Sequence, residues 1–169
     1  MAVCELTLAR WEELDAVMEI LRSGRAFQRQ QGFVQWDDTH PTQAAVEDDI
    51  RRGDGYAIRV DGCLAGYLCL SFDGDPAYPE IVGAWRFDGA YAVIHRMALG
   101  ENHRGRGLTG EIFRLAGEIA KARDVDILRI DTHRDNLRMR HVLEKHGFVC
   151  CGTVVQNGGE RLAFDQKIG

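Results

Sequence analysis

The sequence predicts an α/β domain in which helices flank a mixed, mostly antiparallel sheet. Segments whose apolar residues recur at helical spacing alternate with short apolar or alternating runs that are typical of strands. Two pairs of these runs are joined by tight glycine-containing turns, at residues 61–62 and 157–159, which favour antiparallel hairpins. The predicted order of elements is β-α-α-β-β-β-α-β-α-β-β, within one domain that spans residues 1–169.

The first half of the chain supplies a strand, two helices and a hairpin. A helix is expected from Trp11 to Ser23-Gly24, because glycine interrupts a helical pattern, and residues 25–38 are expected to be irregular. A second helix should begin after Thr42, whose hydroxyl is a good N-cap, and should end near residue 52. The predicted strands are residues 3–8, 56–60 and 63–72.

The second half begins with a long loop, residues 73–89, and loops of this length in compact domains are often functional. A strand at residues 91–99 leads through a glycine-rich turn into a helix that starts at Leu108. A strand at residues 127–132 and a helix at residues 136–146 follow, and Gly147 is a natural end for that helix. The chain then forms a hairpin of residues 148–155 and 160–167.

The composition is that of an ordinary globular protein, with 169 residues, 45% apolar and 28% charged. The formal net charge of −5 argues against a nucleic-acid partner. No apolar run approaches the ~18 residues of a membrane span, and the N-terminal residues do not resemble a secretory signal. Five cysteines without a C-x-x-C pair favour reduced thiols and a cytoplasmic protein, with Cys63 and Cys69 in the core.

The turn His103-Arg-Gly-Arg-Gly-Leu-Thr109 joins a predicted strand to a predicted helix. The first N–H groups of a helix have no partner within the helix, and the helix dipole places partial positive charge there. Gly105 and Gly107 allow close approach of a ligand, and Arg104 and Arg106 add positive charge. The turn therefore predicts a site for a phosphorylated small molecule.

Two general phosphate-binding motifs can be tested against this turn. In the P-loop pattern, Arg106 and Gly107 would occupy the positions of the required lysine and hydroxyl, so that pattern fails. The dinucleotide pattern G-x-G-x-x-G is present at Gly105, Gly107 and Gly110, and Asp131 follows about 20 residues later. An NAD(P)-binding oxidoreductase is therefore the alternative function to be weighed.

Arg104-x-x-Gly107-x-Thr109 resembles the R/Q-x-x-G-x-G/A signature of the GNAT superfamily of N-acetyltransferases, which cradles the pyrophosphate of acetyl-CoA. Residues 136–148 resemble the second signature of that superfamily, N-x-x-A-x-x-L-Y-E-K-x-G-F, and residues 91–99 with 131–136 are similar to a bacterial branch. Thr109 departs from the usual small residue, and Leu143 replaces a tyrosine that often serves as general acid. The matching residues of the second signature are Asn136, Glu144, Lys145, Gly147 and Phe148.

The resemblance implies an enzyme that transfers an acetyl group from acetyl-CoA to a primary amine by direct attack in a ternary complex. It also implies a backbone N–H from the strand before the turn as the donor to the oxyanion. A binding module for acyl-CoA without catalysis is a further alternative, because the tyrosine is missing. The residues expected to bind acetyl-CoA are Met97, Ala98, Leu99, Arg104, Gly105, Arg106, Gly107, Leu108, Thr109 and Asn136.

Three residues are candidates for proton transfer. His95 lies in an apolar strand and is the first candidate for the general base, as opposed to a histidine satisfied by hydrogen bonds in the strand. Asp131 is the second candidate, and its structural alternative is an ion pair with Arg129 or Arg134. His133 could replace the tyrosine as acid or hydrogen-bond within its loop.

The acceptor site is expected in the segments that resemble the superfamily least. Trp36, Tyr78 and Trp85 could line an apolar acceptor pocket, and Asp38 or Glu80 could bind a cationic amine. The expected partner is a small-molecule or peptide amine, and the protein could form a homodimer. The six histidines lack metal-ligand spacing, so no metal site is predicted.

Overall fold

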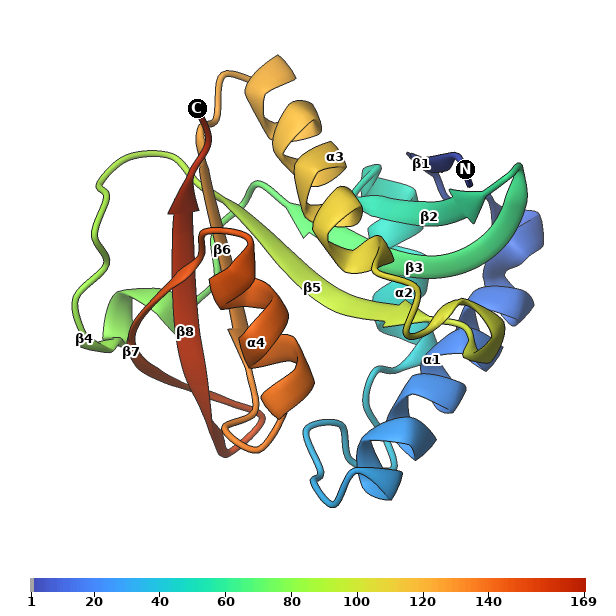
Figure 1. Cartoon of the computed structure of the whole chain (residues 1–169), viewed down its shortest axis with the longest axis horizontal. Helices are drawn as coiled ribbons and strands as arrows, with labels where there is room; N and C mark the ends of the chain where they lie inside the picture. Colours follow the sequence, from blue (N-terminus) through green and yellow to red (C-terminus); the bar gives the residue numbers. More distant parts are fainter. Residues whose placement is uncertain (1) are drawn as a thin grey trace.

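The computed structural model describes residues 2–169 and contains one eight-stranded sheet in the order β1-β2-β3-β5-β6-β8-β7-β4 (Figure 1). Within this part of the chain, β5 and β6 are the one parallel pair, and all other neighbours are antiparallel. The strands are β1 (Cys4–Leu8), β2 (Gly55–Val60), β3 (Cys63–Ser71), β4 (Val82–Gly83), β5 (Ala92–Leu99), β6 (Ile127–Thr132), β7 (Val149–Gln156) and β8 (Gly159–Lys167). The helices are α1 (Leu14–Gln30), α2 (Gln43–Arg52), α3 (Leu108–Ala122) and α4 (Leu137–Lys145).

The structure confirms the predicted mixed sheet and the predicted order of helices and strands, and it adds the two-residue strand β4 inside the long loop. Thr42 caps α2 as expected, because its hydroxyl accepts a hydrogen bond from the Ala45 N–H at 3.1 Å. Gly147 has a φ of 89°, the left-handed conformation expected after a helix.

The predicted end of the first helix at Ser23-Gly24 is wrong, because α1 continues to Gln30. Gly24 lies where the helix packs against β5: a Cβ atom there would be 3.1 Å from the Cβ of Ala98. This glycine therefore permits close contact between helix and sheet, and the packing outweighs its low helix propensity. The expected irregular segment is correspondingly shorter.

The two larger of three buried apolar clusters lie on opposite faces of the sheet. On one face, α3 and α4 pack against alternate strand residues such as Leu68 and Ile94. On the other face, α1 and α2 pack against the intervening residues, including Tyr67 and Ala98. The helices thus form two layers around the sheet, and Figure 1 shows α3 and α4 in front of it.

The loop between β3 and β5 covers the second face beyond α1 and α2. The Arg129 guanidinium of β6 lies between the rings of Trp85 and Tyr91, at 4.1 and 3.9 Å from the ring centroids. Arg86 of the loop pairs with the buried Asp165 of β8 at 2.6 Å. These contacts hold the loop against the sheet, and the loop forms one side of the space between itself and α2.

The parallel strands β5 and β6 separate soon after they begin. They pair at two positions, Ala92 with Leu128 and Val93 with Arg129, and then diverge (Figure 1). On its other side β5 remains paired with β3, but a bulge places Arg96 and Met97 opposite the single β3 residue Leu68. The divergence leaves the carboxyl ends of β5 and β6 without each other as partners.

The expectation that Cys63 lies in the core is wrong, whereas Cys69 is buried as expected. Cys63 is the first residue of β3 after the Asp61-Gly62 turn, and the hairpin end faces solvent. Cys69 lies in the middle of the same strand, between the two layers of helices.

Leu143, at the position of the tyrosine in the second signature, is fully buried in the core formed with Phe113 and Phe148. We predict that Leu143→Tyr lowers the free energy of unfolding by about 1–3 kcal/mol, because the ring overfills this core and its hydroxyl has no partner there. Urea denaturation would measure the change, with Leu143→Met as a control of similar volume. An unchanged stability would contradict the buried position of residue 143.

Candidate active site

Two adjoining cavities occupy the space opened by the divergence of β5 and β6. The smaller, of about 160 Å³, lies between α1, the end of β5, the glycine turn and α4. The larger, of about 360 Å³, extends between β5, β6, α2 and the long loop. The residues that line both cavities are Gln28, Trp36, Met97, Asn136 and Met139, so a ligand can extend from one cavity into the other.

The glycine turn has the backbone geometry of an anion site. Gly105 and Gly107 have φ values of 74° and 71°, in the left-handed region that favours glycine. Gly107 is the N-cap residue of α3, and nothing lies within 4 Å of the position that its Cβ would occupy. There is therefore open space beside Gly107, close to the first N–H groups of α3, which have no partner within the helix and suit a phosphate group.

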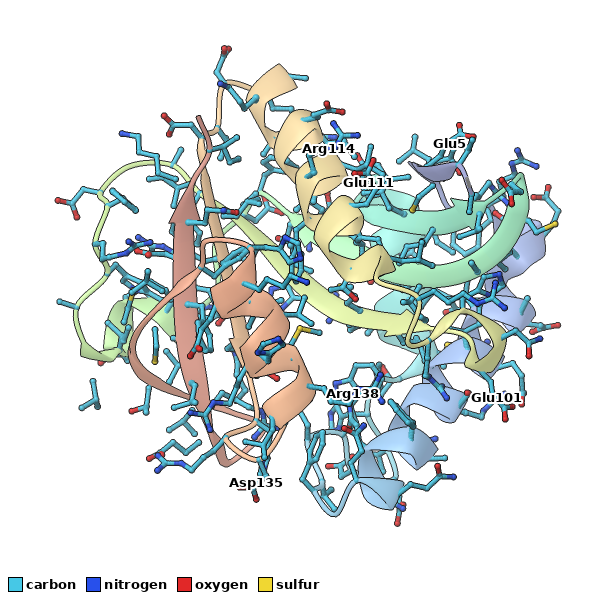
Figure 2. All side chains as sticks on the ribbon, viewed as in Figure 1. Glu5, Glu101, Glu111, Arg114, Asp135 and Arg138 are labelled. Atoms are coloured by element: carbon cyan, nitrogen blue, oxygen red, sulfur yellow. The ribbon has the colours of Figure 1, made fainter. Side chains whose placement is uncertain are left out.

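Arg138, which the sequence did not indicate, adds to the positive charge beside this turn. The Arg104 guanidinium turns toward α1, where it donates to the Leu99 carbonyl at 3.2 Å and to Ser23 Oγ at 2.5 Å. Arg138, from α4, lines the smaller cavity beside Gly105 and points toward α1 (Figure 2). Arg106 is exposed on the turn.

Two of the five aspartates that line the larger cavity, Asp75 and Asp131, are linked by hydrogen bonds. Asp131 accepts hydrogen bonds from the Tyr78 hydroxyl at 2.8 Å and from Gln156 Nε2 at 3.3 Å. The same Gln156 nitrogen donates to Asp75 Oδ2 at 2.9 Å, and His95 Nε2 lies 3.6 Å from that oxygen. One amide thus links two carboxylates, and neither carboxylate has a lysine or arginine partner among the ion pairs of residues 2–169.

Burial controls the protonation of this cluster. It raises the pKa of Asp131, because the charged carboxylate loses solvation, and the hydrogen bond from Tyr78 only partly offsets this effect. Burial and the positive charge of Arg96 lower the pKa of His95 to about 4, so its imidazole is neutral near pH 7. The larger cavity is lined by five aspartates and three arginines, and Asp75 and Asp131, beside the neutral His95, are the two aspartates without an arginine or lysine partner among the described residues.

The other wall of the larger cavity is formed by the segment after α1. Gln35 Oε1 accepts hydrogen bonds from Thr132 Oγ1 at 3.2 Å and from the His133 N–H at 2.9 Å. The buried Arg161 donates to the Gln35 carbonyl at 2.7 Å. Asn136 caps α4, since its Oδ1 accepts from the Met139 N–H at 3.2 Å, and its side chain also lines both cavities.

The structure brings several predicted site residues together. His95 and Asp131 line the larger cavity, and Trp36 lines both cavities. Tyr78, which was expected to line the pocket, is fully buried and lines neither cavity, but its hydroxyl meets the Asp131 carboxylate, which does not pair with Arg129 or Arg134. The proposed ion pair of Asp131 is therefore wrong. The predicted nucleotide-binding residues that line the smaller cavity are Met97, Ala98, Leu99, Arg104, Gly105, Thr109 and Asn136.

Other predicted residues lie outside both cavities. The His133 ring stacks on Phe33 at 5.3 Å between centroids, and its Nδ1 accepts from the Asp135 N–H at 3.0 Å. Trp85 donates to the Tyr78 carbonyl at 2.9 Å and covers Arg129, so it fixes the loop. Asp38 pairs with Arg29 at 2.7 Å. Glu80 is exposed.

Sequence reasoning did not single out Asp75, Gln156 or Arg138. Asp75 lies in the long loop, whose length signals function but does not indicate which residue faces inward. Gln156 meets Asp75 across 81 positions of sequence, a contact that no local pattern reveals. Arg138 lies within the second signature, at a position that the signature leaves open.

The chain belongs to the acetyltransferase (GNAT) family, whose model matches residues 14–148. Among solved structures, a GNAT-family acetyltransferase from Streptococcus agalactiae 2603 is 32% identical, with a TM-score of 0.87 over 98% of this chain and 95% of that one. The chain is therefore an acyl-CoA-dependent N-acetyltransferase.

Two more distant structures share the fold. The complex of AAC(6')-Ib with ribostamycin and coenzyme A is 22% identical, with a TM-score of 0.71, and the match covers 97% of this chain and 93% of that one. The PaiA N-acetyltransferase from Thermoplasma acidophilum, in complex with coenzyme A, is 15% identical, with a TM-score of 0.73 and coverage of 98% and 99%. No curated protein matches the chain.

The family and the sheet do not favour the dinucleotide-binding alternative, because that fold rests on a mostly parallel sheet. Among residues 2–169, no group of three or more His, Cys, Asp or Glu side chains could hold a metal ion. In the same part of the chain, no helix has both the length and the apolar character needed to cross a membrane.

We predict that His95 makes the stability of the protein depend on pH. The folded protein binds a proton at His95 only near pH 4, whereas the unfolded chain binds one near pH 6.5. The free energy of unfolding should therefore fall as the pH drops from 6.5 toward 4, by up to about 3 kcal/mol from this group.

Urea denaturation across this pH range measures the effect. His95→Gln should remove the contribution of this group to the pH dependence of the free energy of unfolding. His141→Gln, at an exposed position on α4, should leave that pH dependence unchanged. An identical slope in His95→Gln and the wild type would show that His95 is protonated equally in both states.

Proposed function

We propose that this enzyme acetylates a primary amine of a small cationic molecule, by direct attack in a ternary complex with acetyl-CoA. The observation that carries the proposal is the acidic cavity around Asp75 and Asp131, which opens into the cleft between β5 and α4. A cation in that cavity would lie beside two carboxylates that have no lysine or arginine partner among the ion pairs of the described residues.

The glycine turn and the start of α3 fit the pyrophosphate of acetyl-CoA. The amides after Gly105 and Gly107 would donate to phosphate oxygens, and Arg138 would supply the nearest charge from α4. Arg104 instead braces the turn against α1. Leu99 lines the smaller cavity and Met97 lines both, so they lie between this turn and the acidic cavity.

Asp131 is the proposed base for the acceptor. An alkylammonium has a pKa of about 10.4 and must lose a proton before its nitrogen can attack. The raised pKa of the buried Asp131 makes it a stronger proton acceptor than an exposed aspartate, and Asp75 and the neutral His95 lie beside it to orient the amine. Leu143, at the position of the family's tyrosine, is buried in the core and supplies no acid. The thiolate of coenzyme A can leave without a strong acid, because a thiol has a pKa of about 8.5.

The structural neighbours support a small polar amine as acceptor. AAC(6')-Ib was crystallised with ribostamycin in one complex and with kanamycin in another. The acidic cavity of this chain would suit a molecule that carries several amines and disfavour one that carries a carboxylate. The net charge of −5 also favours the approach of a cation.

Gly107→Ala tests the nucleotide end of the site. Gly158, in the β7–β8 turn, is a matched control, because both glycines have a φ above 70° and open space around them. We predict that each alanine variant loses about 1 kcal/mol of stability. Only Gly107→Ala should weaken binding of acetyl-CoA in calorimetric titrations, since only that turn would meet the phosphates. Equal affinities for both variants would place the nucleotide elsewhere.

Asp131→Asn tests the acceptor end. We predict that it lowers kcat/KM for a diamine about 100-fold or more, with the affinity for acetyl-CoA unchanged, because it removes the proton acceptor. Release of free thiol would be followed with a diamine, an aminoglycoside and an amino acid, and the two polycations should be the better substrates. Asp135→Asn changes an exposed carboxylate (Figure 2) and should leave the rates unchanged. Preference for the amino acid would overturn the proposed acceptor class.

A further inference from the structure

Arg96 has an unusual backbone conformation for its place in a strand. Its φ is +50°, in the left-handed region that side chains other than glycine seldom adopt within β5. The residue lies in the bulge that places two β5 residues opposite Leu68. Such a conformation persists where surrounding contacts hold it, and it frequently occurs at functional sites.

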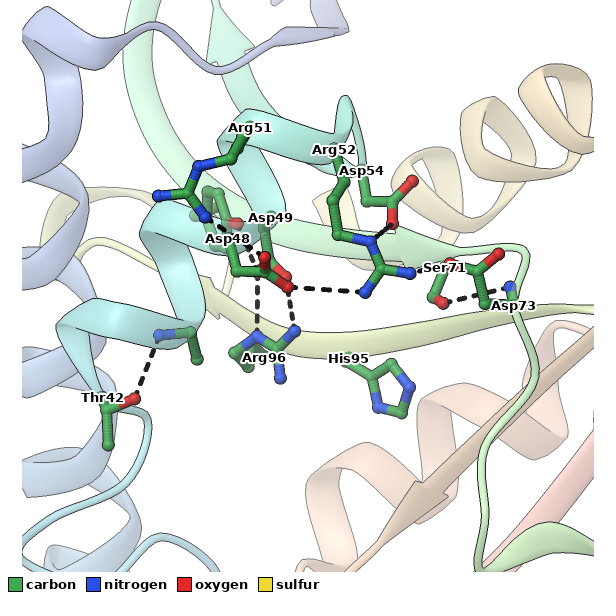
Figure 3. A network of polar contacts seen from close by, with 12 residues as sticks. Thr42, Asp48, Asp49, Arg51, Arg52, Asp54, Ser71, Asp73, His95 and Arg96 are labelled. Atoms are coloured by element: carbon green, nitrogen blue, oxygen red, sulfur yellow. Dashed lines mark hydrogen bonds and ion pairs between the residues drawn. The ribbon is translucent and has the colours of Figure 1, made fainter.

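The contacts that hold Arg96 converge on one buried carboxylate of α2. The Arg96 guanidinium binds Asp49 through two hydrogen bonds, Nε to Oδ2 at 2.9 Å and Nη2 to Oδ1 at 2.6 Å (Figure 3). The hydroxyl of Tyr67, from β3, donates to the same carboxylate at 2.7 Å. Asp49 is 4% exposed and Tyr67 is fully buried, so α2, β3 and β5 are joined at a single point.

This point controls the direction of the next residues of β5. His95 and Met97 flank Arg96, and both line the larger cavity, while Met97 also lines the smaller one. Figure 3 shows His95 projecting from the strand beside Arg96, away from the contacts with Asp49. A rotation of the backbone at residue 96 would move both neighbours relative to the cleft.

We propose that Asp49 is a positioning residue, which holds Arg96 in the left-handed conformation and thereby aims the Met97 N–H into the cleft at the thioester oxygen. The role of that N–H rests on the proposed function, in which the acyl group lies where the two cavities meet. Asp49 itself does not need to touch either substrate, since it acts through Arg96. The bidentate geometry favours arginine at position 96, because a lysine would act as a point charge without the two parallel hydrogen bonds that fix the guanidinium.

The test compares Asp49→Asn with Glu47→Gln, a change of the same kind two residues earlier on α2, where Glu47 contacts Gln43. We expect Asp49→Asn to lower kcat about 10- to 100-fold at a temperature at which the variant is fully folded, with the dissociation constant of acetyl-CoA within about twofold of the wild type. Glu47→Gln should leave both quantities unchanged. A folded Asp49→Asn with wild-type kcat would overturn the proposal.

Arg96→Gly and Arg96→Ala separate positioning from simple structural support. Both lose the contact with Asp49, but glycine adopts a positive φ readily and alanine does not. We expect Arg96→Gly to retain a larger kcat than Arg96→Ala, although its backbone is intrinsically the less ordered of the two. Equal losses in the two variants would contradict the role of the backbone conformation.

Hydrogen exchange distinguishes failure of this inference from failure of the proposed function. If the wild type acetylates no amine, the proposed function fails. Exchange of the amides of residues 95–98 still tests the clamp, by which we mean the hold of Asp49 on the Arg96 backbone conformation. Faster exchange in Asp49→Asn than in Glu47→Gln would support the clamp. Equal exchange in the two variants would overturn it.

Discussion

The separation of β5 from β6 after two residue pairs is the constraint on which the rest of the site depends. Parallel strands normally satisfy one another along their length, so their divergence leaves backbone groups available at the carboxyl ends. On one side of the opening, β5 is held by its pairing with β3, and on the other, β6 is held by β8. The sheet is thus continuous where β5 and β6 begin and open toward their carboxyl ends, and both cavities lie in that opening.

Two buried ion pairs and one cation–π contact keep the opening in shape, and each joins elements that are distant in sequence. Asp49 connects α2 with β5, Asp165 connects β8 with the long loop, and Arg129 lies between two rings of that loop's segment. Buried charges are costly unless they are paired with good geometry, so these contacts favour one arrangement over others. Asp75 and Asp131 differ from them, because their hydrogen bonds come from neutral groups and leave the negative charge available to a ligand.

The secondary structure was largely predictable because local patterns determine it. The cap at Thr42, the left-handed Gly147 and both hairpin turns follow from chemistry within a few residues. The predictions that were wrong concern positions where packing decides. Gly24 continues a helix because β5 lies close against it, and Cys63 is exposed because its hairpin end extends beyond the core. The burial of Leu143 likewise follows from how α4 rests on α3 and the sheet, which the signature does not specify.

The sequence by itself determined the family, the order of elements and the glycine turn, because two motifs of fixed spacing carry that information within short segments. Only the tertiary structure decided which charges face the cleft. Arg104 donates to Ser23 of α1 while Arg138 of α4 joins it at the smaller cavity, and Gln156 links Asp75 to Asp131 although it lies 81 residues from Asp75. The physical reason is that the protonation and orientation of a side chain depend on burial and on neighbours brought together by the fold, and local sequence does not encode either.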